Sequence, residues 1–98
     1  MKRLTDEEIA RELMGLPAWE RDGDAIRRRF AFPGFPEALA YVIRIGFAAE
    51  AADHHPDLLI EYKRVTVRYW THTERGVTSK DLEGARTADA IASAMGGQ

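Results

Sequence analysis

Residues 65–72 constrain the fold of this chain most, because β-branched and aromatic side chains dominate them. Such a run predicts a β-strand, whose successive side chains point to opposite faces of a sheet. One face would carry Val65, Val67 and Tyr69, and the other Thr66, Arg68, Trp70 and His72. The strand therefore has an apolar face that must be covered by other elements of the fold.

Two neighbouring regions supply partner strands. Residues 58–62 predict a short strand directly before this one. Residues 18–32 predict a hairpin, with its turn at Asp22-Gly23-Asp24 and with alternating side chains along its second strand. Those alternating residues are Ile26, Arg28, Phe30 and Phe32.

Three further segments predict helices. Thr5 and Glu8 form a capping-box pair at the start of residues 6–14. Pro36 is suited to open a second helix that continues to residue 53, and a third starts near Thr78 and ends near residue 95. The order α-β-β-α-β-β-α predicts an α+β fold, a four-stranded antiparallel sheet with three helices packed on one face. No repeat or linker interrupts it, so residues 1–98 are expected to form a single domain.

The charge balance excludes some classes of partner. The chain has 14 basic and 16 acidic residues, a net charge of -2, spread along its length. We therefore expect no nucleic acid and no membrane partner. The absence of cysteine excludes disulfides and thiolate chemistry. A charged start without a hydrophobic signal core, and no apolar stretch long enough to span a bilayer, predict a cytoplasmic protein.

The second helix carries apolar residues on more than one face, whereas packing on a sheet buries only one face of a helix. Its apolar residues include Leu39, Tyr41, Val42, Ile43, Ile45 and Phe47. The surplus face predicts a homo-oligomer, because large exposed apolar patches are rare on monomers.

The only histidines in the chain are His54, His55 and His72. An unperturbed imidazole titrates at a pKa of roughly 6.5, which suits proton transfer near neutral pH. We therefore expect a general acid and a general base among them. Glu50 and Asp53 precede the histidine pair at helical spacing, where their carboxylates are placed to orient and charge-tune the His54 ring.

Competing interpretations exist for the same residues. Three imidazoles and a water can form a catalytic zinc site, although adjacent residues in extended chain point to opposite sides, so that His54 and His55 are awkward ligands of one ion. Glu50 and Asp53 can also be solvated residues at a helix end. Asp81 fits a helix cap better than a catalyst.

Spaced motifs along nearly the whole chain carry a family resemblance. They are Glu50-x-x-Asp53-His54-His55-Pro56, then Tyr62, Val65, Thr71-His72 and Gly76-Val77-Thr78-x-Lys80-Asp81, preceded by Trp19 and by Ile26…Phe30-x-Phe32-x-x-Phe35-x-x-Ala38. The chain thereby resembles the pterin-4a-carbinolamine dehydratases. It departs from many members just after the proline, where Asp57-Leu58-Leu59-Ile60 replaces an aromatic residue and leaves the preferred pterin side chain open.

The resemblance implies a hydro-lyase that dehydrates 4a-hydroxytetrahydropterins left by an aromatic amino acid hydroxylase, giving quinonoid dihydropterin for recycling. It implies the fold described above, dimers or tetramers, and no metal or organic cofactor. His54, His55 and His72 fall on the catalytic histidines of the family. The expected substrate-binding residues are Glu50, Asp53, Pro56, Trp70 and Asp81.

We expect the histidines to divide the labour. His54 and His72 would flank the substrate as the proton-transfer pair, because His72 ends a strand on the face away from the core, while His55 contributes mainly binding. The alternative is a non-catalytic role. Some animal members stabilise dimers of a homeodomain transcription factor, and molybdopterin metabolism is a further candidate. The complete histidine set favours the enzyme.

Overall fold

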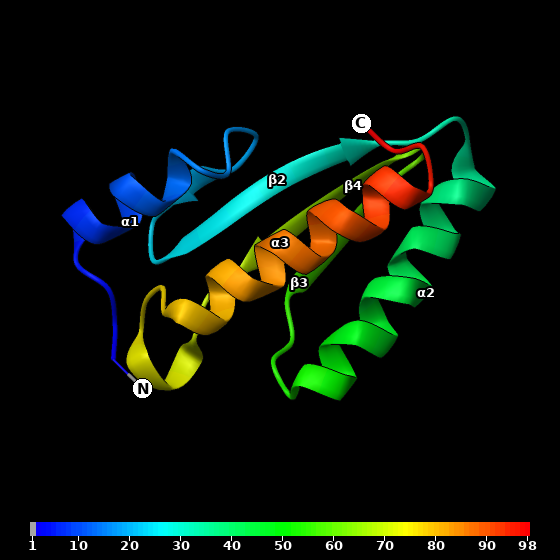
Figure 1. The fold of residues 1–98 in the computed structure, drawn as a ribbon. Helices are drawn as coiled ribbons and strands as arrows, with labels where there is room; N and C mark the ends of the chain where they lie inside the picture. Colours follow the sequence, from blue (N-terminus) through cyan, green and yellow to red (C-terminus); the bar gives the residue numbers. More distant parts are fainter. Residues whose placement is uncertain (1) are drawn as a thin grey trace.

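A computed structural model describes residues 2–98, and its elements follow the predicted order (Figure 1). A short 3-10 helix, η1, is added between the last strand and the last helix. The elements are α1 (Asp6–Leu13), β1 (Glu20–Asp22), β2 (Ala25–Ala31), α2 (Phe35–Ala52), β3 (Asp57–Glu61), β4 (Arg64–Tyr69), η1 (His72–Glu74) and α3 (Ser79–Ala94).

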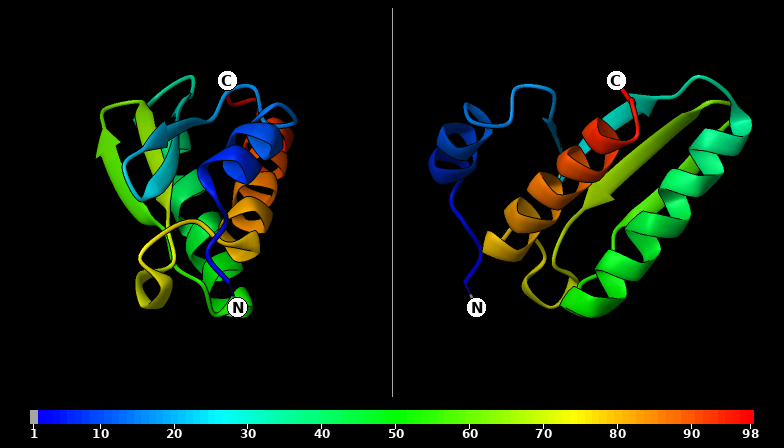
Figure 2. Two further views of the ribbon diagram at one scale, coloured as in Figure 1. Left: turned by 90° about the vertical axis from the view of Figure 1, so that its left-hand side faces the viewer. Right: turned by 45° about the vertical axis from the view of Figure 1, so that its right-hand side comes forward.

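The four strands form one antiparallel sheet in the order β1-β2-β4-β3. Helices α2 and α3 cross one face of this sheet, and α1 lies on the same side beyond the β1 end (Figures 1 and 2). Within residues 2–98, no helix covers the other face of the sheet (Figure 2). The predicted α+β fold, with three helices against a four-stranded antiparallel sheet, is confirmed.

The core lies between the sheet and the helices. Ile26 and Phe30 of β2 and Val65 and Val67 of β4 are fully buried there. The Tyr41 hydroxyl donates a hydrogen bond of 3.0 Å to a backbone carbonyl of α3, which ties α2 to α3. The alternation seen in the sequence thus places the apolar side chains of both central strands under the helices.

Strand β4 ends earlier than predicted. It stops at Tyr69, and Thr71 then pairs with Gly76 in an isolated bridge that closes a tight loop. Arg75 completes this loop in the left-handed conformation, at φ 53°. The prediction that His72 ends a strand was wrong, because His72 begins η1 inside this loop.

Helix α2 ends one residue before the predicted boundary. Asp53 is its C-cap and adopts the left-handed conformation, with φ 52° and ψ 40°. This residue turns the chain out of the helix axis, so His54 no longer follows the helical spacing of Glu50. No helix within residues 2–98 has both the length and the apolar character required to cross a membrane.

Candidate active site

Most of the predicted site residues meet in one hollow beside the end of α2, the loop after β4 and the start of α3. Its volume is about 410 Å³, within the range of roughly 300–1,000 Å³ that is usual for small-molecule sites. The lining residues are Asp53, His54, His55, Trp70, Thr71, His72, Thr73 and Lys80. Segments that are far apart in the sequence therefore bring all three histidines to a single site.

His54 is the most enclosed of the three histidines, with 14% of its side chain exposed. Its Nε2 lies 2.5 Å from Oδ1 of Asp81. Its ring also stacks on Tyr69, with the ring centroids 5.8 Å apart and the planes 17° from parallel. Two independent contacts thus fix the orientation of this imidazole.

Asp81 holds His54 from behind and is itself fully buried. Its Oδ2 accepts hydrogen bonds from the Thr71 hydroxyl and from the backbone N–H of Thr78, each 2.8 Å long. With His54 on Oδ1, both carboxylate oxygens are occupied, as a buried carboxylate requires. A carboxylate only accepts hydrogen bonds, so Nε2 of His54 donates and Nδ1 is the ring nitrogen left for other partners.

Tyr69 forms the apolar floor beside this pair. Burial, and then the nearby charge of Asp81, raise the pKa of its phenol to about 12. Tyr69 is therefore a neutral stacking surface for His54 at physiological pH.

His55 lies at the rim of the hollow. Its Nε2 is 2.8 Å from Oε1 of Glu50, and both side chains are largely exposed. An exposed pair of this kind typically contributes about 0–1 kcal/mol, so it orients the ring only weakly. Both His54 and His55 line the hollow, although adjacent residues in extended chain point to opposite sides.

His72 and Trp70 form a ring pair on another part of the lining. Their ring centroids are 4.0 Å apart and their planes meet at 34°. Trp70 is half-buried, whereas His72 is exposed to the hollow. This pair places two aromatic rings at the edge of the hollow.

The predicted acidic partners are rearranged. The expectation that Glu50 and Asp53 orient His54 was wrong, because the left-handed turn at Asp53 redirects the chain and brings His54 to Asp81 instead. Glu50 pairs with His55, and Asp53 lines the hollow. Asp81 also caps α3 in a capping box with Thr78, which confirms its predicted structural role.

Two other predicted positions differ in their access to the hollow. Asp81 lies behind His54, with none of its surface exposed, and so reaches the hollow only through that ring. Pro56 is half-buried and does not belong to the lining formed by the described residues.

Lys80 is a lining residue that the sequence reasoning missed. It borders the hollow and also a smaller pocket of about 140 Å³ between α2 and α3, on whose wall His54 lies as well. A signal was present, because Lys80 occupies the first turn of a predicted helix, where the helix dipole disfavours a cation. Thr71, which belongs to the Thr71-His72 motif, and Thr73, which belongs to no motif, also line the hollow.

The three histidines do not form a ligand cluster. Within residues 2–98, no group of three or more histidine, aspartate or glutamate side chains is arranged to hold a metal ion. The zinc interpretation therefore has no support from the geometry of the described residues.

Comparisons with known proteins agree with the fold and the motifs. The family model described as pterin 4 alpha carbinolamine dehydratase matches residues 2–91. A relative from Roseiflexus sp. strain RS-1 is 45% identical over 89 residues, covering 91% of this chain and 96% of the relative. One from Thermomicrobium roseum is 45% identical over 93 residues, covering 95% and 100%. Both carry the name pterin-4-alpha-carbinolamine dehydratase provisionally.

Two solved structures are also similar. A transcriptional coactivator/pterin dehydratase from Brucella melitensis superposes with a TM-score of 0.89 at 39% identity, covering 93% of this chain and 99% of that chain. A pterin dehydratase-like protein, identified as a RuBisCO assembly factor in the alpha-carboxysome, superposes with a TM-score of 0.64. It is 19% identical, covering 76% of this chain and 86% of that chain, and so shares the fold alone.

Proposed function

Because this chain belongs to the pterin-4-alpha-carbinolamine dehydratase family, we propose that it is a hydro-lyase that dehydrates 4a-hydroxytetrahydropterins by histidine acid-base catalysis. The observation that carries the proposal is the hollow in which His54, held by Asp81, and His72, stacked on Trp70, both reach the same space. Quinonoid dihydropterin would be the product, available for reduction and reuse by an aromatic amino acid hydroxylase.

The reaction requires two proton movements. A proton must reach the departing 4a-hydroxyl, which leaves as water when the C4a–O bond breaks. A proton must also leave N5, whose N–H bonding electrons become the new C4a=N5 bond. Positioned imidazoles in opposite protonation states suit both movements, and each such group typically contributes roughly 10²- to 10⁴-fold.

His54 is proposed as one of the pair, because its surroundings fix its tautomer. Asp81 accepts a hydrogen bond from Nε2–H and so leaves Nδ1 for the substrate, much as a buried carboxylate fixes the tautomer of the histidine in a catalytic triad. His72 is proposed as the second member, on the part of the lining formed with Trp70. Which of the two acts as acid is left to the pH profile of each variant.

The remaining residues are proposed to bind the substrate. Trp70 offers an aromatic surface for the pterin ring, and Asp53 and His55 offer polar contacts within the hollow. Glu50 would act through the His55 ring that it contacts. Pro56 would shape the turn after the histidines, and Asp81 would act through His54.

An assay on chemically generated 4a-carbinolamine tests the proposal. We expect faster formation of quinonoid dihydropterin, followed by absorbance, than in the spontaneous reaction, and the same rate with and without a chelator. The double variant H54A/H72A is the matched control and should fall to the spontaneous rate. No acceleration by the wild-type protein would refute the proposal. Inhibition by the chelator would instead support a catalytic metal site.

A binding role is the second candidate. The Brucella relative is described as a transcriptional coactivator as well as a pterin dehydratase. In this chain, Leu39, Ile43 and Phe47 leave an exposed apolar stripe along α2 that is suited to association. Tight pterin binding without turnover in the same assay would favour this role.

A further inference from the structure

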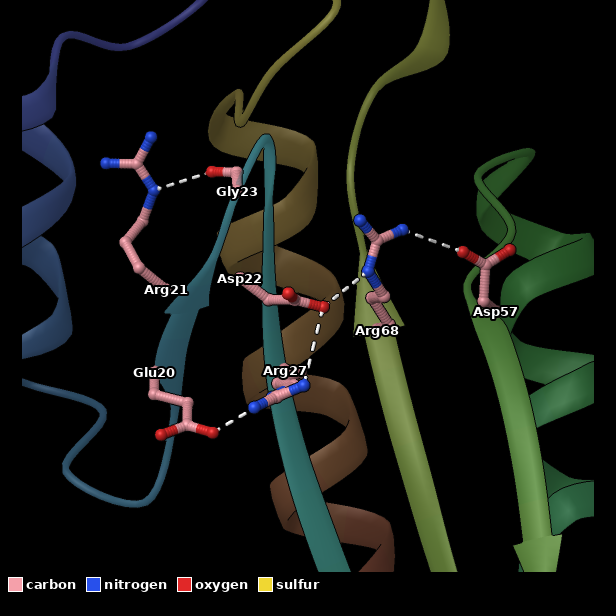
Figure 3. A network of polar contacts seen from close by, with 7 residues as sticks. All are labelled: Glu20, Arg21, Asp22, Gly23, Arg27, Asp57 and Arg68. Atoms are coloured by element: carbon pink, nitrogen blue, oxygen red, sulfur yellow. Dashed lines mark hydrogen bonds and ion pairs between the residues drawn. The ribbon is translucent and has the colours of Figure 1, made fainter.

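A chain of ion pairs crosses the helix-free face of the sheet and involves all four strands (Figure 3). Glu20 pairs with Arg27 at 2.9 Å, and Arg27 lies 3.7 Å from Asp22. Asp22 also pairs with Arg68 at 2.8 Å, and Arg68 reaches Asp57 at 3.1 Å. We call these five residues the strand ladder.

Arg68 is the member of the strand ladder that is held from both sides. Its Nε donates to Asp22, at the end of β1, and its Nη1 donates to Asp57, at the start of β3. The guanidinium is planar, so two bonds to different nitrogens fix its plane as well as its position. The hydrogen bond to Asp22 raises the pKa of Arg68 and, from the other side, lowers the pKa of Asp22.

The Arg68 guanidinium also contacts the candidate active site through Trp70. Its Cζ lies 5.6 Å from the centroid of the Trp70 ring, within the usual range of a cation–π contact. The His72 ring contacts the same indole, and the two ring centroids are 4.0 Å apart. The three side chains thus form a continuous series from the sheet face to the hollow.

Trp70 depends on such stacking for its orientation. Its Nε1 is buried and has no hydrogen-bond partner, and it is the only such side-chain atom among residues 2–98. The other indole of the chain, Trp19, is anchored by a 2.8 Å bond from Nε1 to Asp89. Within residues 2–98 no hydrogen bond of this kind holds the Trp70 ring, so packing and the contacts with Arg68 and His72 are left to orient it.

We propose that Arg68 is a positioning residue that holds Trp70, and through it His72, in place in the hollow. This inference rests on the proposed function only in assigning a catalytic use to His72. Arg68 itself lies on the sheet face, outside the lining of the hollow, and acts through the indole.

The primary readout is the nuclear magnetic resonance signal of the His72 ring, because an indole stacked on it displaces its ring-proton shifts. R68A should move these shifts toward those of an unstacked histidine, as W70L does. R68K should keep only part of the wild-type displacement of the His72 shifts. Its ammonium group carries the charge but lacks the guanidinium fork that reaches both aspartates. R27A is the matched control, because Arg27 pairs in the same ladder, opposite Arg68 in register, with no ring contact to Trp70.

Catalysis provides a second readout. We expect R68A to lower kcat by about tenfold and to change KM less. A misplacement of an ångström can lower the rate by roughly 10²-fold, and the expected loss is smaller than that. R27A should retain the wild-type kcat. If R68A does not fold, D22N removes one of its anchors, and the same displacement of the His72 shifts should follow.

The outcomes are separable. Unchanged His72 shifts in R68A, or equal changes in R68A and R27A, would overturn the positioning role whether or not the protein is an enzyme. A wild-type protein that lacks dehydratase activity yet shows the shift change would refute the proposed function and leave the positioning role standing.

Discussion

Asp81 has two functions at the level of single residues. It completes the capping box at the start of α3, and it occupies Nε2 of His54. The fold thereby places a candidate catalytic imidazole against a helix start that the capping box of Thr78 and Asp81 also holds. The two roles use different carboxylate oxygens, Oδ1 for His54 and Oδ2 for the cap, so different substitutions of Asp81 can distinguish its effects on activity and on stability.

We predict that D81N lowers kcat by roughly 10²-fold or more, because an amide can donate to His54 and so favour the wrong tautomer. D81A should also destabilise the fold by about 1–3 kcal/mol, since buried donors lose their acceptor. Steady-state kinetics and urea unfolding measure the two effects. The chain offers a matched control in E8Q, which alters the equivalent capping box of α1, away from the hollow, and should leave kcat unchanged. An equal loss of kcat in E8Q and D81N would contradict this account.

The three histidines should respond differently to alanine. H54A or H72A is expected to lower kcat by about 10²-fold or more, because each removes a proton-transfer group. H55A should chiefly raise KM, since His55 lies at the rim in a weak contact with Glu50. Kinetics on the purified variants decide this. The assignment is reversed if H55A abolishes kcat while H54A is nearly silent.

At the scale of elements, local signals predicted the fold well and long-range contacts escaped prediction. The capping boxes at Thr5 and Thr78 are set by residues three apart, and both formed as expected. The contact between His54 and Asp81 joins residues 27 apart in sequence, and no local pattern encodes it. The left-handed C-cap at Asp53 was likewise not predictable, because the residue that usually indicates such a cap is glycine.

The end of β4 shows the same limit. Residues 70–72 have the composition of a strand, so sequence pattern alone extended it to His72. The Thr71–Gly76 bridge and the 3-10 turn prevail because they close the loop onto α3, where Asp81 accepts from Thr71. Tertiary hydrogen bonds thus overrode local β-propensity.

The strand ladder leads to a pH prediction at this scale. The bond from Arg68 lowers the pKa of Asp22 below its ordinary value of 3.8. A carboxyl with a depressed folded-state pKa stabilises the fold above the unfolded-state pKa, and this contribution is lost as the pH falls through the folded-state value. D22N should therefore be less stable than wild type at neutral pH, with the difference shrinking in acid below pH 3.8. Urea unfolding across this range measures it, and a difference independent of pH would assign the effect to packing.

At the scale of the whole molecule, no other part of residues 2–98 covers one face of α2. Phe35, Leu39, Ile43 and Phe47 recur every four residues along it and are exposed, Phe47 by 76%. The opposite side of the same helix carries the buried Tyr41 and Ile45. The helix is thus apolar on two sides, as the sequence indicated, and only one of them is covered within the described chain.

We predict that this stripe is an interface between copies of the chain. Light scattering at micromolar concentration should give a mass above the 11.0 kDa of one chain. I43E and F47E should lower that mass toward the mass of one chain. Association would then bury a glutamate of one copy against the stripe of the other copy, which is unfavourable. M14E is the control, since Met14 is 82% exposed yet is the C-cap of α1, away from the stripe. A wild-type protein that scatters as a single chain would show that the stripe meets some other partner, and a mass lowered equally by M14E would mean that general surface charge, not this face, governs association.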